Sequence, residues 1–261
     1  MGQLDGKVAL VTGGSRGIGR TIAQAYLDEG ARVVISSRSE ANGKEALHSF
    51  DAGDRATFLA GDMTVRESVD QVVDGTVAHF GALDILVNNA GGIQTLGTVW
   101  DLSDDGWMDT INLNLHATFW ATRRALPHMM AKGWGRVLNI SSLEGKVGLP
   151  MISAYCAAKH AIHGFTKAVA KEVGRAGVTV NCLCPGYIPE TDLARNIGAD
   201  IAPMLGLGSV DDLSAMFAQQ SATGRTPTLA DCVGPAVLLA SDAGASITGV
   251  TLSIDGGIAQ S

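Results

Sequence analysis

Short apolar runs alternate with longer helical stretches along the chain. The short runs consist mostly of apolar and β-branched residues, which is typical of parallel strands covered on both faces. They predict strands at Val8–Thr12, Arg32–Ser36, Ala56–Ala60, Ile85–Asn88, Gly135–Ser141, Thr179–Cys184 and Thr251–Ile254. The stretches between them predict helices near Gly17–Glu29, Val65–Phe80, Asp104–Lys132, Tyr155–Arg175 and Leu229–Ala240.

This alternation predicts an α/β fold, a single doubly wound Rossmann-type domain with a parallel sheet of about seven strands. One domain is expected to span residues 1–261, since α/β domains of this length are common. The rhythm breaks between about residues 189 and 226, which are rich in Gly, Met and Leu. We expect a small helical lid there.

Composition and charge narrow the possible partners. The 19 basic and 26 acidic residues give a net charge of −7, which argues against a nucleic-acid or anionic-membrane partner. No apolar stretch approaches the ~20 residues of a membrane span, and the N-terminus has no signal-peptide core, so a cytoplasmic location is expected.

Four cysteines show no framework spacing. Cys182 and Cys184 are two apart in a predicted strand, so both should point to one face. A zinc site would need a further pair of Cys or His nearby, and none is evident from the spacing. We therefore expect buried reduced thiols and no metal.

A glycine-rich turn, Thr12-Gly13-Gly14-Ser15-Arg16-Gly17-Ile18-Gly19, joins the first strand directly to the first helix. Glycines let the backbone approach a pyrophosphate, and a helix N-terminus offers free N–H groups. In this context the turn predicts a dinucleotide site, with a purely structural turn as the alternative. The loop residues expected to hold the cofactor are Gly13, Ser15, Arg16, Gly17, Ile18 and Gly19.

The choice of cofactor depends on the end of the second strand. A carboxylate there would bind the ribose hydroxyls of NAD, but this chain has Ser36-Ser37-Arg38. Ser37 and Arg38, with Arg16, can surround a 2′-phosphate, so NADP(H) is preferred and NAD(H) remains possible. The alternative is that Arg38 is a solvated charge and that Arg16 stacks on adenine.

With Asn88-Asn89-Ala90-Gly91 after the fourth strand, the glycine loop resembles the short-chain dehydrogenase/reductase family. The similarity runs nearly end to end. It implies that Asp62 and Met63 border the adenine, and that the backbone of Ile188 meets the nicotinamide amide. The other cofactor residues that it implies are Asn89, Gly91, Pro185, Gly186 and Thr191. Thr191 lies one position later than the family's threonine, because Glu190 stands in that place.

Tyr155-Cys156-Ala157-Ala158-Lys159 begins a predicted helix and places Tyr155 and Lys159 on one face. A free phenol has a pKa of about 10, and we expect Lys159 and the oxidised nicotinamide to lower it. Tyr155 then serves as general acid in reduction and general base in oxidation. Lys159 and Tyr155 are also expected to contact the cofactor.

The remaining catalytic positions come from spacing. Ser142 precedes Tyr155 by the thirteen residues typical of the family, which favours it over the neighbouring Ser141 as the donor to the substrate oxygen. The run from Asn114-Leu115 to Phe119 matches the family and selects Asn114 over Asn112. The resemblance implies that Asn114 holds a water that links Lys159 to solvent.

Gln94 and Glu144 are polar exceptions in an otherwise apolar pocket wall, and with Ser142 and Tyr187 they are the substrate residues that we expect. At Gly92-Ile93-Gln94 and Ala157-Ala158-Lys159-His160 the chain resembles 3-hydroxybutyrate dehydrogenases. That subgroup has a histidine in place of Glu144 and a lysine in place of Ile152 to bind a carboxylate. Glu144 would repel such an anion.

These observations favour an NADP(H)-dependent oxidoreductase that interconverts a neutral or carrier-linked ketone and a secondary alcohol, with 3-oxoacyl reductases as the nearest general resemblance. An NAD-dependent alcohol or polyol dehydrogenase is the first alternative. A cofactor-sensing binding protein is the second, although such a sensor would be expected to lack Tyr155 or Lys159. The family resemblance also implies a homotetramer packed through the long helices.

Overall fold

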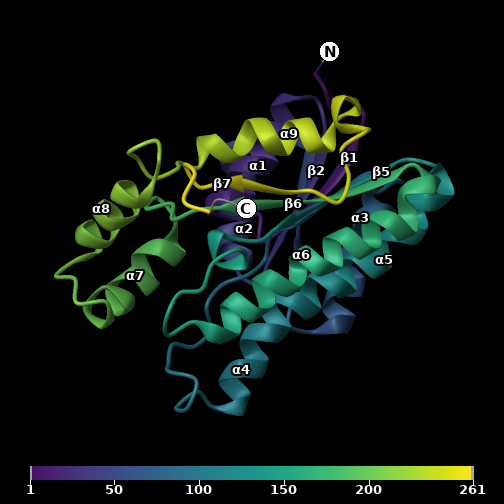
Figure 1. Cartoon of the computed structure of the whole chain (residues 1–261). Helices are drawn as coiled ribbons and strands as arrows, with labels where there is room; N and C mark the ends of the chain where they lie inside the picture. Colours follow the sequence, from purple (N-terminus) through teal and green to yellow (C-terminus); the bar gives the residue numbers. More distant parts are fainter. Residues whose placement is uncertain (1, 260–261) are drawn as a thin grey trace.

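The computed structural model describes residues 2–259 and contains a seven-stranded parallel sheet (Figure 1). Its strands are β1 (Val8–Thr12), β2 (Arg32–Ser37), β3 (Ala56–Ala60), β4 (Ile85–Asn88), β5 (Gly135–Ile140), β6 (Val178–Pro185) and β7 (Thr251–Ile254). They pair in the order β3-β2-β1-β4-β5-β6-β7, every pair parallel. The predicted fold class is confirmed, and each predicted strand end lies within one residue of the observed end.

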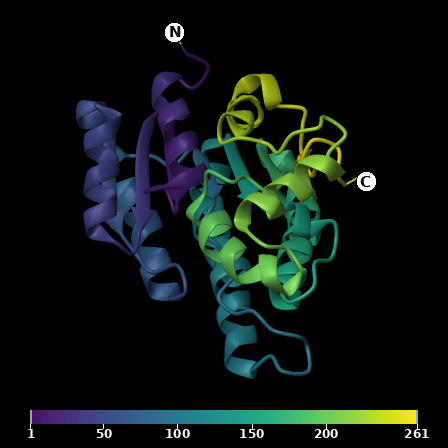
Figure 2. The same cartoon turned by 90° about the vertical axis from the view of Figure 1, so that its left-hand side faces the viewer.

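Helices cover both faces of the sheet (Figures 1 and 2). On one face lie α1 (Gly17–Asp28), α2 (Glu40–Phe50) and α9 (Val233–Ala240), and on the other lie α3 (Arg66–Phe80), α5 (Ala117–Lys132) and α6 (Ser153–Val173). The strands serve both layers because successive side chains point to opposite faces. In β1, Ala9 and Val11 join the first layer, whereas Leu10 joins the second.

Helix α2 is an element that the sequence pattern did not reveal. Only Gly43, Ala46 and Phe50 are buried along it, so its apolar stripe is sparse. Its start is well marked, because the Ser39 side chain accepts a hydrogen bond of 3.2 Å from the Asn42 backbone N–H.

The predicted helix Asp104–Lys132 is divided in the structure. It consists of α4 (Asp104–Ile111), a π-helical turn at Asn112–His116, and α5. Within this wider turn, Asn114 binds the segment after β4: its Oδ1 accepts from Gly92 N–H at 3.0 Å, and its Nδ2 donates to Gly92 C=O at 2.8 Å. Such π-helical turns often mark functional sites.

The predicted lid segment contains two helices, α7 (Asp192–Met204) and α8 (Val210–Gln220), at one end of the sheet (Figure 1). Ala202, Leu213 and Phe217 pack on Leu143, which follows β5. Ile201 packs on Ile152 and Tyr155. The predicted helix Leu229–Ala240 is shorter than expected, since Ala230–Cys232 forms a 3-10 turn ahead of α9. Within residues 2–259, no helix has both the length and the apolar character required to span a membrane.

Candidate active site

A cleft of about 510 Å³ lies at the carboxyl ends of β1, β4, β5 and β6. The strand order changes direction between β1 and β4, which is where open α/β sheets bind their ligands. Nearly all the predicted site residues line this one cleft. The exceptions are Gly19, Asp62 and Asn114, which are not among its lining residues.

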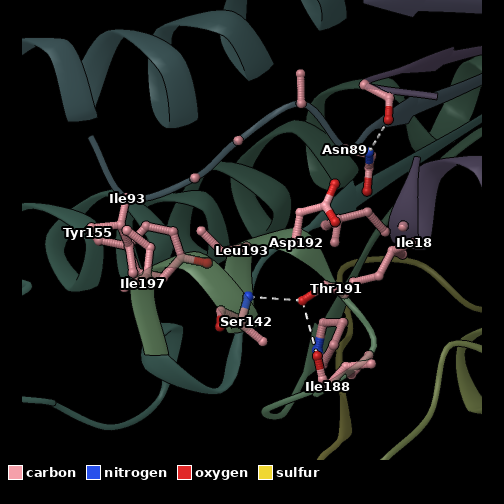
Figure 3. A pocket seen from close by; sticks show the side chains of 18 of the residues that line it. Ile18, Asn89, Ile93, Ser142, Tyr155, Ile188, Thr191, Asp192, Leu193 and Ile197 are labelled. Atoms are coloured by element: carbon pink, nitrogen blue, oxygen red, sulfur yellow. Dashed lines mark hydrogen bonds between the residues drawn. The ribbon is translucent and has the colours of Figure 1, made fainter. Parts of the chain in front are cut away.

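The glycine loop forms one end of the cleft. Gly13 and Gly17 have φ values of +64° and +53°, a backbone conformation that favours glycine. Asn89 holds the loop in place, because its Nδ2 donates to the carbonyls of Thr12 and Gly13 at 3.0 and 3.1 Å. Figure 3 draws one of these two bonds. Gly19 is needed for this contact, since a Cβ there would lie 2.4 Å from the amide nitrogen of Asn89.

The loop fits a dinucleotide pyrophosphate. No side chain caps the N-terminus of α1, so its first N–H groups have no side-chain partner. A helix start of this kind binds anions through those groups and through the helix dipole. The residues present therefore fit the group that the sequence implied.

Two arginines line the end of the cleft near the glycine loop. Arg38 follows β2, and Arg16 belongs to the glycine loop, where its Nη1 lies 3.1 Å from Asp192 Oδ2 at the start of α7. Asp62 is held by Thr64, which donates to its Oδ1 through N–H and hydroxyl at 2.9 and 2.7 Å. Burial raises the pKa of Asp62, but these bonds and the Arg38 charge outweigh it and lower the pKa below its usual value.

Tyr155 and Lys159 lie one turn apart on α6, with Lys159 Nζ 5.4 Å from the centre of the Tyr155 ring. Lys159 is only 4% exposed, and its Nζ donates to the Ile140 carbonyl at 2.9 Å. Burial lowers the pKa of Lys159 to about 8, although the charges of Cys182, Cys184 and Glu144 oppose this. Ser142 follows β5 beside them, and its hydroxyl donates to Glu144 Oε2.

The pKa of Tyr155 differs from the expectation that Lys159 lowers it. In the chain alone, burial raises this pKa well above its usual value, the charge of Glu144 raises it further, and the Ser142 hydroxyl lowers it only in part. Lys159 directs its ammonium group to the Ile140 carbonyl. Near neutral pH the phenol is therefore the stable form of Tyr155, and a phenol can donate a proton.

Comparison with known proteins agrees with this site. The family model described as short chain dehydrogenase matches residues 7–202. The chain is 36% identical to a 3-oxoacyl-acyl-carrier-protein reductase of Haemophilus influenzae, covering 98% of this chain and 99% of the relative. It is 35% identical to a D-beta-hydroxybutyrate dehydrogenase of Cupriavidus necator, covering 97% and 98%. A solved variant of actinorhodin polyketide ketoreductase with NADPH superposes with a TM-score of 0.93, at 31% identity and full coverage of both chains.

The chain belongs to the short-chain dehydrogenase family. As a short-chain dehydrogenase, it is an NAD(P)-dependent oxidoreductase.

The segment after β6 holds Thr191, which lies one position later than the threonine of other short-chain dehydrogenases. Thr191 caps α7: its hydroxyl accepts from Ala194 N–H at 3.1 Å and donates to the Ile188 carbonyl at 3.0 Å (Figure 3). The Thr191 hydroxyl is thus bound within the protein. Tyr187 stacks on Phe217 at 4.8 Å and 9°, so its ring joins the end of β6 to α8.

The structure brings His163 to Cys182 and Cys184, which the sequence pattern did not reveal. The two thiols lie on one face of β6, as predicted, with their sulfurs 4.0 Å apart, and His163 Nε2 on α6 is 3.3 Å from Cys184 Sγ. Ser141 donates its proton to the Lys159 carbonyl, so His163 Nε2 must donate to Ser141 Oγ at 2.9 Å. These contacts end at the backbone carbonyl of Lys159.

Several lining residues were missed as individual positions. The lid contributes Leu193, Ile197 and Ile201 to the cleft, and α2 with its cap contributes Ser39 and Asn42. A signal for the first group was present, because 193, 197 and 201 are four apart and share a helix face.

Proposed function

We propose that this chain reduces a neutral ketone to a secondary alcohol with NADPH as the hydride donor. The observation that supports this most is the convergence of a protonated, buried Tyr155, Ser142 and Lys159 in the cleft that the glycine loop also lines. When bound, the nicotinamide supplies the hydride. All the other steps belong to the residues of the chain.

In this mechanism Ser142 donates a hydrogen bond to the ketone oxygen, and Tyr155 donates its proton to that oxygen as the alcohol forms. The Lys159 ammonium stabilises the phenolate that remains. The two protons on Asn114 Nδ2 are committed to the carbonyls of Gly92 and Thr110 at 2.8 Å each. This amide fixes the segment beside Lys159, and its part in a water relay stays a prediction.

NADPH is favoured over NADH by Arg16 and Arg38 at the adenosine end. The pair of Arg16 with Asp192 is largely exposed, and such pairs contribute little to stability. A 2′-phosphate can therefore replace Asp192 as the partner of Arg16. The structural neighbour solved with NADPH supports the same choice.

Neutral ketones are favoured because the carboxyl of Glu144 borders the cleft where a substrate carboxylate would need a cation. A carrier-linked ketone, as in the 3-oxoacyl reductase relatives, is compatible with the apolar wall, although the net charge of −7 gives little attraction for an acidic carrier. NAD-dependent oxidation of an alcohol or polyol is the second candidate, and the hydroxybutyrate dehydrogenase relative supports it.

The apolar side chain of Phe119 on α5 is 38% exposed, and it meets the ring of Phe165 on α6 edge-on at 6.3 Å. The exposed ring of Phe119, beside the half-buried Phe165 on the neighbouring long helix, supports the homotetramer that we propose for this short-chain dehydrogenase.

A panel of neutral aliphatic and aryl ketones with NADPH and NADH tests the proposed function. We expect NADPH consumption with matching formation of secondary alcohol, and slower or no turnover of small keto acids. Binding of cofactor without turnover of any ketone or alcohol would instead indicate a sensor.

The pH dependence of ketone reduction should follow Lys159. Its lowered pKa of about 8 means that the ammonium is present below pH 8 and is lost above it. We therefore expect kcat/KM for reduction to be level below about pH 8 and to fall by up to about tenfold per pH unit above it. The measurement is kcat/KM from pH 6 to pH 10. A level profile through pH 10 would contradict this assignment.

A further inference from the structure

Glu144 is a carboxyl in the cleft wall that the mechanism above does not use. It lies in the 3-10 turn Leu143–Gly145, directly after Ser142, and it borders the same cleft as Tyr155. Much of the wall on this side is apolar. Its apolar members include Ile93, Leu149, Ile152, Ile197 and Ile201.

The Glu144 carboxyl accepts a hydrogen bond that the proposed reaction would take away. Ser142 has one hydroxyl proton, and in this structure it donates that proton to Glu144 Oε2. The proposed reduction needs the same proton at the ketone oxygen. Ketone binding therefore removes this donor and leaves the carboxyl with the hydrogen bond from its own backbone N–H. A half-buried acceptor that loses one of its donors carries a free-energy penalty.

Two neighbouring groups do not relieve this penalty. Lys159 points its Nζ to the Ile140 carbonyl, so its charge acts on Glu144 from a distance. The Tyr155 proton is needed at the ketone oxygen. A donor carried by the substrate itself would restore the hydrogen bond.

We propose that Glu144 selects ketones that carry a hydroxyl group on the carbon next to the carbonyl, and that it accepts a hydrogen bond from this hydroxyl. The inference rests on the proposed function and names the substrate class of the same site. The Ser142 hydroxyl lies within one hydrogen bond of the carboxyl and of the expected carbonyl oxygen. A donor one carbon away from the carbonyl is therefore within reach of the carboxyl. In either protonation state the carboxyl keeps an oxygen that can accept.

Paired substrates test this selection. We would measure kcat/KM for 2-hydroxyacetophenone and acetophenone with the wild-type protein, Glu144→Gln and Glu144→Met. The wild-type protein should favour the hydroxy ketone. That ratio should fall by about ten- to a hundredfold in Glu144→Met and by less in Glu144→Gln, which keeps an accepting oxygen. Glu172→Gln, an exposed change of the same kind on α6, should leave the ratio unchanged.

A ratio that Glu144→Met does not move would overturn the inference. So would a wild-type preference for acetophenone, as expected if a protonated Glu144 donated to the ketone oxygen.

A binding measurement separates this inference from the proposed function. Calorimetry gives the Kd values of 1-phenyl-1,2-ethanediol and 1-phenylethanol for the protein–NADPH complex. Their ratio compares ligands with and without the neighbouring hydroxyl group, and it needs no turnover. If no ketone is reduced but Glu144→Met removes a preference for the diol, the proposed function fails and the selection by Glu144 stands. If ketones are reduced and neither ratio depends on Glu144, the function stands and the selection fails.

Discussion

Replacing Tyr155 by phenylalanine should reduce ketone reduction by about a hundred- to ten-thousandfold, the usual contribution of a general acid. The ring is buried against Ile152 and Ile201, and phenylalanine keeps that packing while removing the proton. The measurement is kcat with NADPH and a ketone that the wild-type protein reduces. NADPH affinity should change little, because we expect the glycine loop to bind the larger part of the cofactor.

Tyr26→Phe provides the matched control for this variant. The Tyr26 hydroxyl donates to the Ala236 carbonyl at 3.1 Å in the core between α1 and α9, away from the cleft. Tyr26→Phe also loses a phenolic hydroxyl, but outside the cleft. Its thermal stability should therefore fall slightly while its turnover is retained. Near-normal turnover of Tyr155→Phe would contradict the proposed mechanism.

Replacing Arg38 by alanine should lower kcat/KM for NADPH by about ten- to a hundredfold and leave kcat/KM for NADH nearly unchanged. A hydrogen bond to a charged group contributes about 1.5–3 kcal/mol, and only NADPH brings the 2′-phosphate that uses it. The measurement is kcat/KM for each cofactor at a fixed, saturating ketone concentration. High salt should reduce the effect of Arg38→Ala on NADPH kinetics, because Arg38 is exposed and its attraction for the 2′-phosphate is screened by ions.

Lys44→Ala is a suitable control for Arg38→Ala. Lys44 lies on α2, and its Nζ pairs with Glu40 at 2.8 Å. Its removal changes the net charge by the same amount without touching the cleft wall, so the cofactor ratio should stay constant. A wild-type preference for NADH, or unchanged NADPH kinetics in Arg38→Ala, would contradict the assignment of NADPH.

Much of the fold could be predicted because its causes are local in sequence. The parallel strands are buried on both faces and therefore form continuous apolar runs, and the glycine loop lies between a strand and a helix. Helix α2 was missed because its local pattern is weak: it buries only Gly43, Ala46 and Phe50. The division of the helix at Asn112–His116 could not be predicted, because Asn114 binds Gly92, twenty-two residues earlier.

The sequence predicts which residues form the candidate site, but it does not predict their pKa values. Spacing brought Tyr155, Lys159 and Ser142 together, and the structure places all three on one cleft. Their protonation depends on burial and on neighbours from other elements. Glu144 raises the pKa of Tyr155 further, and the thiols of Cys182 and Cys184 act on that of Lys159. Contacts of this kind arise only when the chain has folded.

The strand order separates two tasks along the chain. Strands β1 to β3 lie on one side of the point where the order changes, and their loops contribute the lining residues that we propose meet the adenosine half of the cofactor. Strands β4 to β7 lie on the other side, with the proton donor and the substrate-contacting walls that we propose. The two sides meet at Asn89, which binds the glycine loop, and at the pair of Arg16 with Asp192. For protein engineering, Arg38 is the better position at which to change cofactor preference alone, because it takes part in neither contact.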